Sequence, residues 1–373
     1  MKIDRRLVQN MDWLLLAAAL VVVGLGLTTL ANLSLTRGSM IVSRQLAWAG
    51  IGLLALLLVA SLDYRHLIRA APALYVGGVG LLLAVSVVGR TVSGARRWIP
   101  LGPVSVQPSE LFKLIFILTL VWVFTSRWSH PPSRGTVSLT LGLLVVPFLL
   151  IVKQPDLGSA VVLFPVVLVL LAGAGLRLLA LGGLSLAGLA GMPVAWLLLK
   201  DYQRERLLVY LDPFRDPQGT AYHLIQSKIA IGSGQLLGKG IVDATQSRLA
   251  FLPERHTDFI FAAFAEMWGF VGCLVLITAY GVLLLRGFEI AATARDAGGR
   301  LTALGVTVLV ATQTLANMGM ATGLLPVVGL PLPLMSYGGS SMVVTMAGLG
   351  LLLSVRMRQF RVIGQGAAAL GWR

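Results

Sequence analysis

Apolar residues occur along this chain in runs of roughly 20, separated by short stretches that carry most of the charged residues. A helix of about 20 residues is long enough to cross the hydrocarbon core of a bilayer. We therefore predict ten membrane-spanning helices, with boundaries good to a few residues. The predicted spans are residues 13–32, 45–62, 71–89, 110–126, 137–152, 158–175, 177–199, 258–285, 301–322 and 336–355.

The predicted fold class is an all-α polytopic membrane protein, in which residues 1–373 form a single integral membrane domain. A long loop, residues 200–257, joins the seventh and eighth spans, and a short tail, residues 357–373, follows the tenth. The division between the sixth and seventh spans rests only on residues 175–177. Composition agrees with this class, because charged residues make up 12% of the chain, about half the share of a soluble domain.

The distribution of Lys and Arg predicts the orientation in the membrane. Ten spans place both chain ends on one side, and short segments on that side hold Lys2, Arg5, Arg6, Arg65, Arg69, Arg127, Arg134, Arg177, Arg286, Arg295, Arg300, Arg356, Arg358, Arg361 and Arg373. Short loops on the other side hold only Arg37, Arg44, Arg90, Arg96, Arg97 and Lys153. Because cytoplasmic loops carry the excess of basic residues, we expect both termini in the cytoplasm and the 200–257 loop outside.

Charge and cysteine content remove several function classes. A formal charge of +15 would suggest nucleic acid for a soluble protein, but membrane topology accounts for the basic residues here. We expect no nucleic-acid partner. The single cysteine, Cys273, excludes an internal disulfide and a thiol metal site. The sequence contains no Walker-type glycine loop, which argues against an ATP-driven pump.

Polar motifs that are unusual for a membrane protein all fall on the predicted outer side. Glu110 and Lys113 lie one turn apart at the outer start of the fourth span, on one helix face. They form either an ion pair that allows two charges to sit at membrane depth, or part of a polar cavity faced by Lys113. The two interpretations are compatible, and both stay open at this point.

The neighbouring loops offer further candidates. Arg96 and Arg97 precede Trp98, so they suit either an interfacial anchor or the recognition of a phosphate. Asp156 is favoured as the cap of the sixth helix. The 200–257 loop opens with a charged stretch that includes Arg204, and residues 222–231 resemble an amphipathic helix.

Asp258 stands where the long loop enters the eighth span, directly before Phe259, Ile260 and Phe261. In that position it can interact with the helix dipole. Partial burial by these apolar side chains would instead raise its pKa and make it a better general base. His256 is an alternative base on the loop side of the apolar run.

Residues 323–340 are apolar yet rich in glycine and proline. Non-helical backbone at membrane depth persists only where it is buried in protein or lines a wet cavity. Ser336 and Ser340 bracket the predicted start of the last helix, whose free N–H groups could bind an anion, although a plain tight loop is also possible.

Taken together, these motifs resemble the SEDS family (shape, elongation, division and sporulation). The matching stretches are Arg97-Trp98, Gln107-Pro108-Ser109-Glu110, Gln154-Pro155-Asp156-Leu157-Gly158, Tyr222-His223, Gln226-Ser227, Leu252-Pro253-Glu254-Arg255-His256-Thr257-Asp258-Phe259, Pro331-Leu332-Pro333-Leu334 and Ser336-Tyr337-Gly338-Gly339-Ser340. They follow in the expected order over nearly the whole chain. Arg255 and the short N-terminal tail resemble the branch that acts in cell elongation and shape, rather than in division.

The resemblance implies a peptidoglycan glycosyltransferase of the bacterial cytoplasmic membrane that joins lipid II units into a nascent glycan strand on its outer face. It also implies a class B penicillin-binding protein as partner, and Asp258 matches the position of the family's essential aspartate. Such a reaction needs one base, assigned to Asp258, and positive charge for the departing pyrophosphate. Arg96, Arg97, Lys113 and Arg204 are the candidates for that charge, with Glu110, Ser336 and Ser340 as further substrate-binding residues. No tightly bound cofactor is expected, although a divalent Mg or Mn ion is possible.

Two other functions compete with this prediction. A transporter that flips the lipid-linked precursor could use the same cations, but it would need polar groups along the whole passage rather than on one side. A non-catalytic scaffold for a transpeptidase would have no use for a partly buried carboxylate among cations. The polymerase is therefore the leading hypothesis.

Overall fold

The computed structural model describes residues 10–34, 40–92, 95–102, 104–127, 129–191, 193, 196–197, 201–212, 221–240, 244 and 254–359. Within them, eight helices are long and apolar enough to cross a membrane. They are α2 (Trp13–Ser34), α3 (Met40–Ser61), α4 (Tyr64–Val88), α5 (Pro108–Ser126), α6 (Arg134–Lys153), α13 (Ile260–Thr293), α14 (Ala297–Thr322) and α15 (Gly339–Arg358).

Two shorter apolar helices, α7 (Leu157–Gly173) and α8 (Leu178–Ala190), occupy the sixth and seventh predicted spans. Every predicted span therefore overlaps an apolar helix, although residues 192, 194, 195, 198 and 199 of the seventh span lie outside the described residues. The helical polytopic fold is confirmed. Two helices of the long loop are described, α10 (Asp201–Leu211) and α11 (Tyr222–Ser233), the second of which was expected as an amphipathic helix. Residues 200, 213–220, 241–243 and 245–253 of that loop lie outside the described residues, as do residues 360–373 of the predicted tail.

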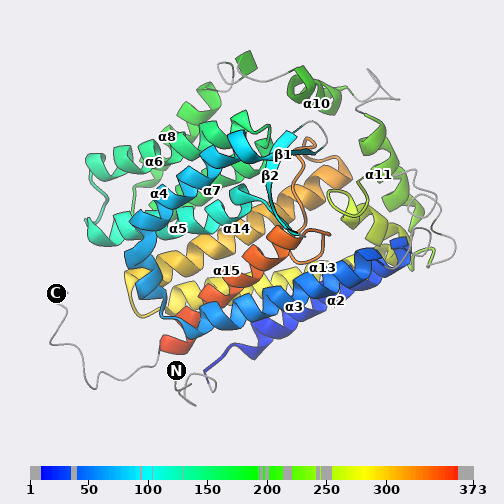
Figure 1. Cartoon of the computed structure of the whole chain (residues 1–373), viewed down its shortest axis with the longest axis horizontal. Helices are drawn as coiled ribbons and strands as arrows, with labels where there is room; N and C mark the ends of the chain where they lie inside the picture. Colours follow the sequence, from blue (N-terminus) through cyan, green and yellow to red (C-terminus); the bar gives the residue numbers. More distant parts are fainter. Residues whose placement is uncertain are drawn as a thin grey trace.

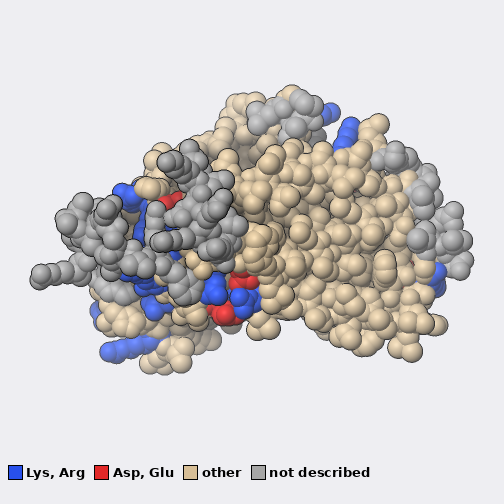
Figure 2. Space-filling view, turned by 90° about the horizontal axis from the view of Figure 1, so that it is seen from below, with Lys and Arg blue, Asp and Glu red and all other residues tan. Residues whose placement is uncertain are grey.

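Helices α5, α14 and α15 form the interior of the bundle, and the other helices pack around them (Figure 1). Large apolar side chains such as Leu54, Val76 and Val87 point outward, more than 60% exposed. Figure 2 shows the result, a broad middle surface without charged side chains, with most of the visible Lys and Arg at one end and a few at the other. Such a surface is suited to contact with lipid tails rather than water.

A small β-sheet follows α4, although the sequence predicted only a loop between helices at this position. Strands β1 (Arg90–Val92), β2 (Ala95–Leu101) and β3 (Val104–Val106) form an antiparallel sheet in the order β1-β2-β3. Gly102, with φ of +65°, provides the left-handed turn between the second and third strands. Strands of three to seven residues are too short to give a clear alternating pattern, which explains why the all-α prediction missed them.

Helix α13 is broken at Gly269, where φ is +64° and ψ is −162°. Residues 234–240, which follow α11, pack into this break and pair with its backbone. The bonds run from Lys239 N–H to Glu266 O (2.9 Å), Gly240 N–H to Met267 O (3.0 Å), Phe270 N–H to Gln235 O (2.8 Å) and Val271 N–H to Leu236 O (3.0 Å). The glycine-rich segment therefore satisfies backbone groups that an interrupted membrane helix would leave unpaired.

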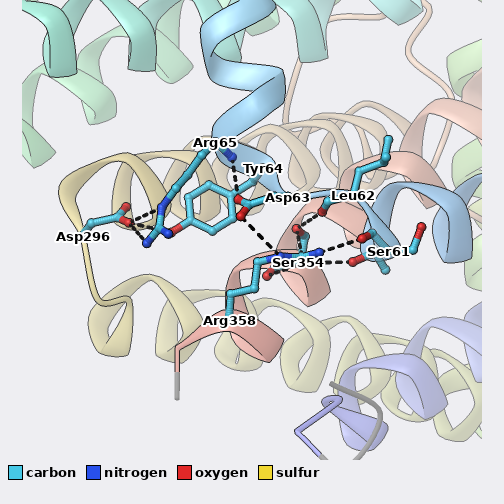
Figure 3. A network of polar contacts seen from close by, with 9 residues as sticks. Ser61, Leu62, Asp63, Tyr64, Arg65, Asp296, Ser354 and Arg358 are labelled. Carbon is cyan, nitrogen blue, oxygen red and sulfur yellow. Dashed lines mark hydrogen bonds and ion pairs between the residues drawn. The ribbon is translucent and has the colours of Figure 1, made fainter. Parts of the chain in front are cut away.

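The predicted inner ends of four helices, α3, α4, α14 and α15, are joined by polar contacts (Figure 3). Asp296 caps α14 and accepts hydrogen bonds from the Tyr64 hydroxyl (2.7 Å) and from Arg65 (2.6 Å), both at the start of α4. Arg358, at the end of α15, donates to the carbonyl oxygens of Ala60 (3.1 Å) and Ser61 (2.7 Å) at the end of α3. This cluster fixes the side of the bundle opposite to the candidate site.

Candidate functional site

Asp258 lies in a turn, residues 254–259, that leads into α13. The predicted span began at residue 258, but the helix begins at Ile260 and Phe259 is its N-cap residue. Asp258 is therefore outside the helix and half-buried. Glu254 has φ of +50°, so the turn does not continue the helix backwards, and Glu254 and Asp258 do not share a helix face.

Three consecutive carbonyl oxygens of this turn, those of His256, Thr257 and Asp258, accept hydrogen bonds from distant parts of the chain. The donors, in the same order, are the Tyr337 N–H (2.8 Å), the Ser336 hydroxyl (2.7 Å) and the Asn317 side-chain amide (2.9 Å). The backbone that carries Asp258 is therefore fixed by α14 and by the stretch before α15.

The stretch between α14 and α15 has no helix from residue 323 to 338, as its glycines and prolines predicted. The last helix begins at Gly339, three residues later than expected. Ser336 accepts a hydrogen bond from the N–H of Leu332 (2.7 Å), and Gln45 of α3 donates to the Ser336 carbonyl oxygen (3.0 Å). Because the Ser336 hydroxyl both accepts and donates within the protein, it fixes the loop, and its role in binding substrate stays a prediction.

A second group of contacts joins the start of α15 to α5 and α7. The Gln107 N–H donates to the Ser340 hydroxyl (3.0 Å), and the Gln107 side chain donates to Asp156 (3.0 Å). Ser109 donates to the same Asp156 oxygen (2.9 Å). Asp156 also accepts from the N–H of Ser159 (3.4 Å), so the predicted helix cap is confirmed. The other carboxylate oxygen of Asp156 accepts the bonds from Gln107 and Ser109, which precede it by 49 and 47 residues.

The two neighbouring arginines of β2 point in different directions, because successive side chains of a strand alternate between its faces. Arg97 is directed towards the start of α7, where it donates to the carbonyl oxygens of Gln154 (3.3 Å) and Pro155 and lies 3.9 Å from Asp156. Arg96 is exposed. Arg97 therefore belongs to the same group of contacts as Gln107, Ser109 and Asp156, which we call the Asp156 group. The Arg96 side chain is accessible from outside the bundle.

Glu110 and Lys113 form the predicted ion pair, with 2.6 Å between Lys113 Nζ and Glu110 Oε1. Their side chains are only 3% and 1% exposed. The buried ion pair is confirmed. Its depth in the membrane and a polar cavity at Lys113 stay predictions. Arg204 donates to the carbonyl oxygens of Trp196 and Leu197, just before α10, and its place in the substrate site also stays a prediction.

Sequence reasoning did not select Asn317, Gln45 or the side chain of His223. The His223 ring of α11 stacks on Phe259 with centroids 6.2 Å apart, which joins α11 to the turn of Asp258. Asn317 had a detectable signal, because it is an uncharged polar residue within a predicted span and such residues are often functional. Among the described residues, no group of three His, Cys, Asp or Glu could hold a metal ion.

Comparison with known proteins places this arrangement in a family. A family model described as "Cell cycle protein", which covers FtsW, RodA and SpoVE, matches residues 6–360. The chain belongs to the SEDS family. The resemblance inferred from the motifs is therefore confirmed, and so is a multi-pass membrane protein as its architecture.

Curated SEDS relatives align over most of the chain. The peptidoglycan glycosyltransferase MrdB of Escherichia coli K12 is 44% identical over 313 residues, which is 84% of each chain. Stage V sporulation protein E of Bacillus subtilis is 37% identical over 316 residues, or 84% of this chain and 86% of that protein.

Solved structures also match this SEDS protein. A chain from a structure entitled "Structural coordination of polymerization and crosslinking by a peptidoglycan synthase complex" has a TM-score of 0.80 at 38% identity, with 94% of this chain and 99% of that chain covered. The rod shape determining protein RodA of Thermus thermophilus has a TM-score of 0.71 at 33% identity, covering 94% and 98%.

Proposed function

We propose that this chain is a peptidoglycan glycosyltransferase that polymerises lipid II at the outer face of the bacterial cytoplasmic membrane during elongation. Curated relatives with this activity in their names cover most of the chain. The observation that carries the assignment of the site is the turn of Asp258, whose backbone is held at three consecutive carbonyl oxygens while its carboxylate is half-buried.

In the proposed reaction, a sugar hydroxyl of one glycan attacks the anomeric carbon of another. A new glycosidic bond forms, and the bond from that carbon to pyrophosphate breaks. The pyrophosphate leaves with the electron pair and needs no proton, so a second carboxylate acting as an acid is not required, in contrast to glycoside hydrolysis. Asp258 takes the proton of the attacking hydroxyl as general base.

The departing pyrophosphate requires positive charge near the site. Arg96 and Arg97 are the favoured donors of that charge, because Arg96 is exposed and Arg97 retains 26% exposure beside the Asp156 group. Lys113 contributes less in this scheme, since Glu110 balances its charge at 2.6 Å. Arg204 and the two serines, Ser336 and Ser340, complete the proposed binding residues, and a divalent ion could arrive with the pyrophosphate.

A class B penicillin-binding protein is the proposed partner. The support is the structural match to a chain of a peptidoglycan synthase complex that is described as coordinating polymerization and crosslinking. In the same proposal, both termini of this chain lie in the cytoplasm and the Asp258 turn faces outward, as the distribution of Lys and Arg indicates.

The flippase alternative is not favoured, because the curated relatives are named as glycosyltransferases rather than transporters. The decisive experiment uses the purified chain in liposomes that contain lipid II. We expect glycan strands longer than a disaccharide, detected by gel electrophoresis, and higher yield when the partner transpeptidase is added. Translocation of lipid II between leaflets without any strand formation would refute the polymerase and establish the transporter.

A further inference from the structure

Asn317 of α14 connects the two irregular segments of the candidate site. Its side-chain nitrogen donates one hydrogen bond to the Asp258 carbonyl oxygen (2.9 Å) and another to the Leu330 carbonyl oxygen (2.7 Å). The residue is completely buried. One amide group therefore joins the turn before α13 to the stretch before α15, and it does so from a regular helix.

The chemistry of the side chain suits this task. A primary amide has two N–H donors and no charge in the physiological range, so it can satisfy two carbonyl oxygens at once without placing an ion inside the bundle. Both Nδ2 bonds go to backbone atoms of segments that have no helix to orient them. An aliphatic side chain of similar size would fill the space but leave both carbonyl oxygens without this donor.

The position of the bond makes it relevant to the base. The Asp258 carbonyl group is attached to the same α-carbon as its side chain, so the bond restricts the backbone angles that set the direction of the carboxylate. The turn is also held at Thr257 and His256, but those two donors come from neighbouring residues of one segment. Of these three donors, Asn317 alone lies within a regular helix, the 26-residue α14.

We propose that Asn317 is a positioning residue that holds the Asp258 carboxylate in the orientation needed for proton abstraction. This inference rests on the proposed function. A general base must come within about 2.6–3.2 Å of the proton it removes. Displacement of a reacting group by about 1 Å can reduce the rate on the order of 100-fold, so the orientation of Asp258 matters as much as its chemistry.

The test compares Asn317→Leu with the wild-type chain in the lipid II liposome assay. We expect kcat to fall about 100-fold, while KM for lipid II stays within about twofold because Asn317 does not bind substrate. Amide hydrogen exchange should accelerate in residues 254–260. Thr314→Val is the matched control, because Thr314 is buried three positions earlier on α14 and its hydroxyl has no hydrogen-bond partner within the described residues; it should leave kcat and exchange unchanged.

Asn317→Gln provides a second variant if the leucine variant folds poorly. It retains the two donors but places them one methylene further out, so we expect a smaller loss of kcat and intermediate exchange. Wild-type kcat in both folded variants, or a loss confined to KM, would overturn the proposal. A wild-type chain that makes no glycan strands would instead refute the proposed function, so the two failures are distinguishable.

Discussion

Several buried charged residues of the described part of the chain, among them Asp12, Glu110 and Asp156, lie beside a group of opposite charge. The spacing of Glu110 and Lys113 was enough to predict their pairing, because residues three apart on a helix are neighbours. The capping role of Asp156 was also predictable from its place before a helix. Its bonds to Gln107 and Ser109 were not, because they join segments that only the folded bundle brings together. Interactions between residues close in the sequence could be predicted from the sequence, and hydrogen bonds between distant segments could not.

The buried pair gives a prediction about stability. Lys113→Met should destabilise the chain by about 3–5 kcal/mol, because it leaves the Glu110 carboxylate buried without its partner. The double variant Glu110→Gln/Lys113→Met should recover most of this loss, since no uncompensated charge remains. Thermal unfolding in detergent measures both effects. Equal destabilisation of the single and double variants would contradict this account of the pair.

Helices were predictable as elements, but their interruptions were not. Each apolar run gave a helix, because a run of this length has no other way to satisfy its backbone in a membrane. The break of α13 at Gly269 was not predicted, because a single glycine within an apolar run is compatible with a continuous helix. The break depends on residues 234–240, which pair with it from outside the helix.

The break predicts opposite effects for two glycines of the same helix. Gly269→Ala should destabilise the chain by at least about 1–3 kcal/mol, because its backbone angles are nearly restricted to glycine. The new methyl group would also lie 2.2 Å from the Gly238 nitrogen. Gly281→Ala is the control, because a Cβ there meets nothing within 4 Å, and it should be neutral or stabilising by up to about 1 kcal/mol. Unfolding temperatures that change equally in the two variants would count against the pairing.

The cap of α14 predicts a dependence on pH. Burial alone would raise the pKa of Asp296, but hydrogen bonds from the Gly299 N–H, the Tyr64 hydroxyl and Arg65 outweigh it, so the net shift is downward. A lowered native pKa means that the carboxylate stabilises the fold above its unfolded pKa of about 3.9, and that this contribution is lost as the pH falls further.

Asp296→Asn should therefore unfold at a lower temperature than wild type at pH 7, and the difference should shrink towards pH 3. Unfolding curves of both chains at several pH values test this directly. A difference that stays constant from pH 7 to pH 3 would show that the charge of Asp296 does not contribute to the contacts drawn in Figure 3.

For the whole molecule, the distribution of Lys and Arg predicts which side each loop occupies. The folded chain separates the Asp258 turn, before α13, from the polar cluster around Asp296, after α13. Because one helix that is long enough to span the membrane connects them, they should lie on opposite sides.

Cysteine labelling in intact cells tests this orientation. In a Cys273→Ser background, Glu254→Cys should react with a membrane-impermeant maleimide added outside, because Glu254 is exposed in the turn of Asp258. Arg295→Cys, beyond the other end of α13, should react only after the membrane is permeabilised. Labelling of the two positions in the reverse order would place the candidate site in the cytoplasm and exclude a periplasmic polymerase.

The most direct test of the central claim is the rate of glycan strand formation by Asp258→Asn, compared with Glu254→Gln in the same turn. We expect the asparagine variant, which keeps the shape of the side chain but cannot accept the proton, to lose about 100- to 10,000-fold in rate. The Glu254→Gln chain, altered at an exposed carboxylate, should polymerise normally. Wild-type strand formation by a folded Asp258→Asn chain would contradict the assignment of Asp258 as the base.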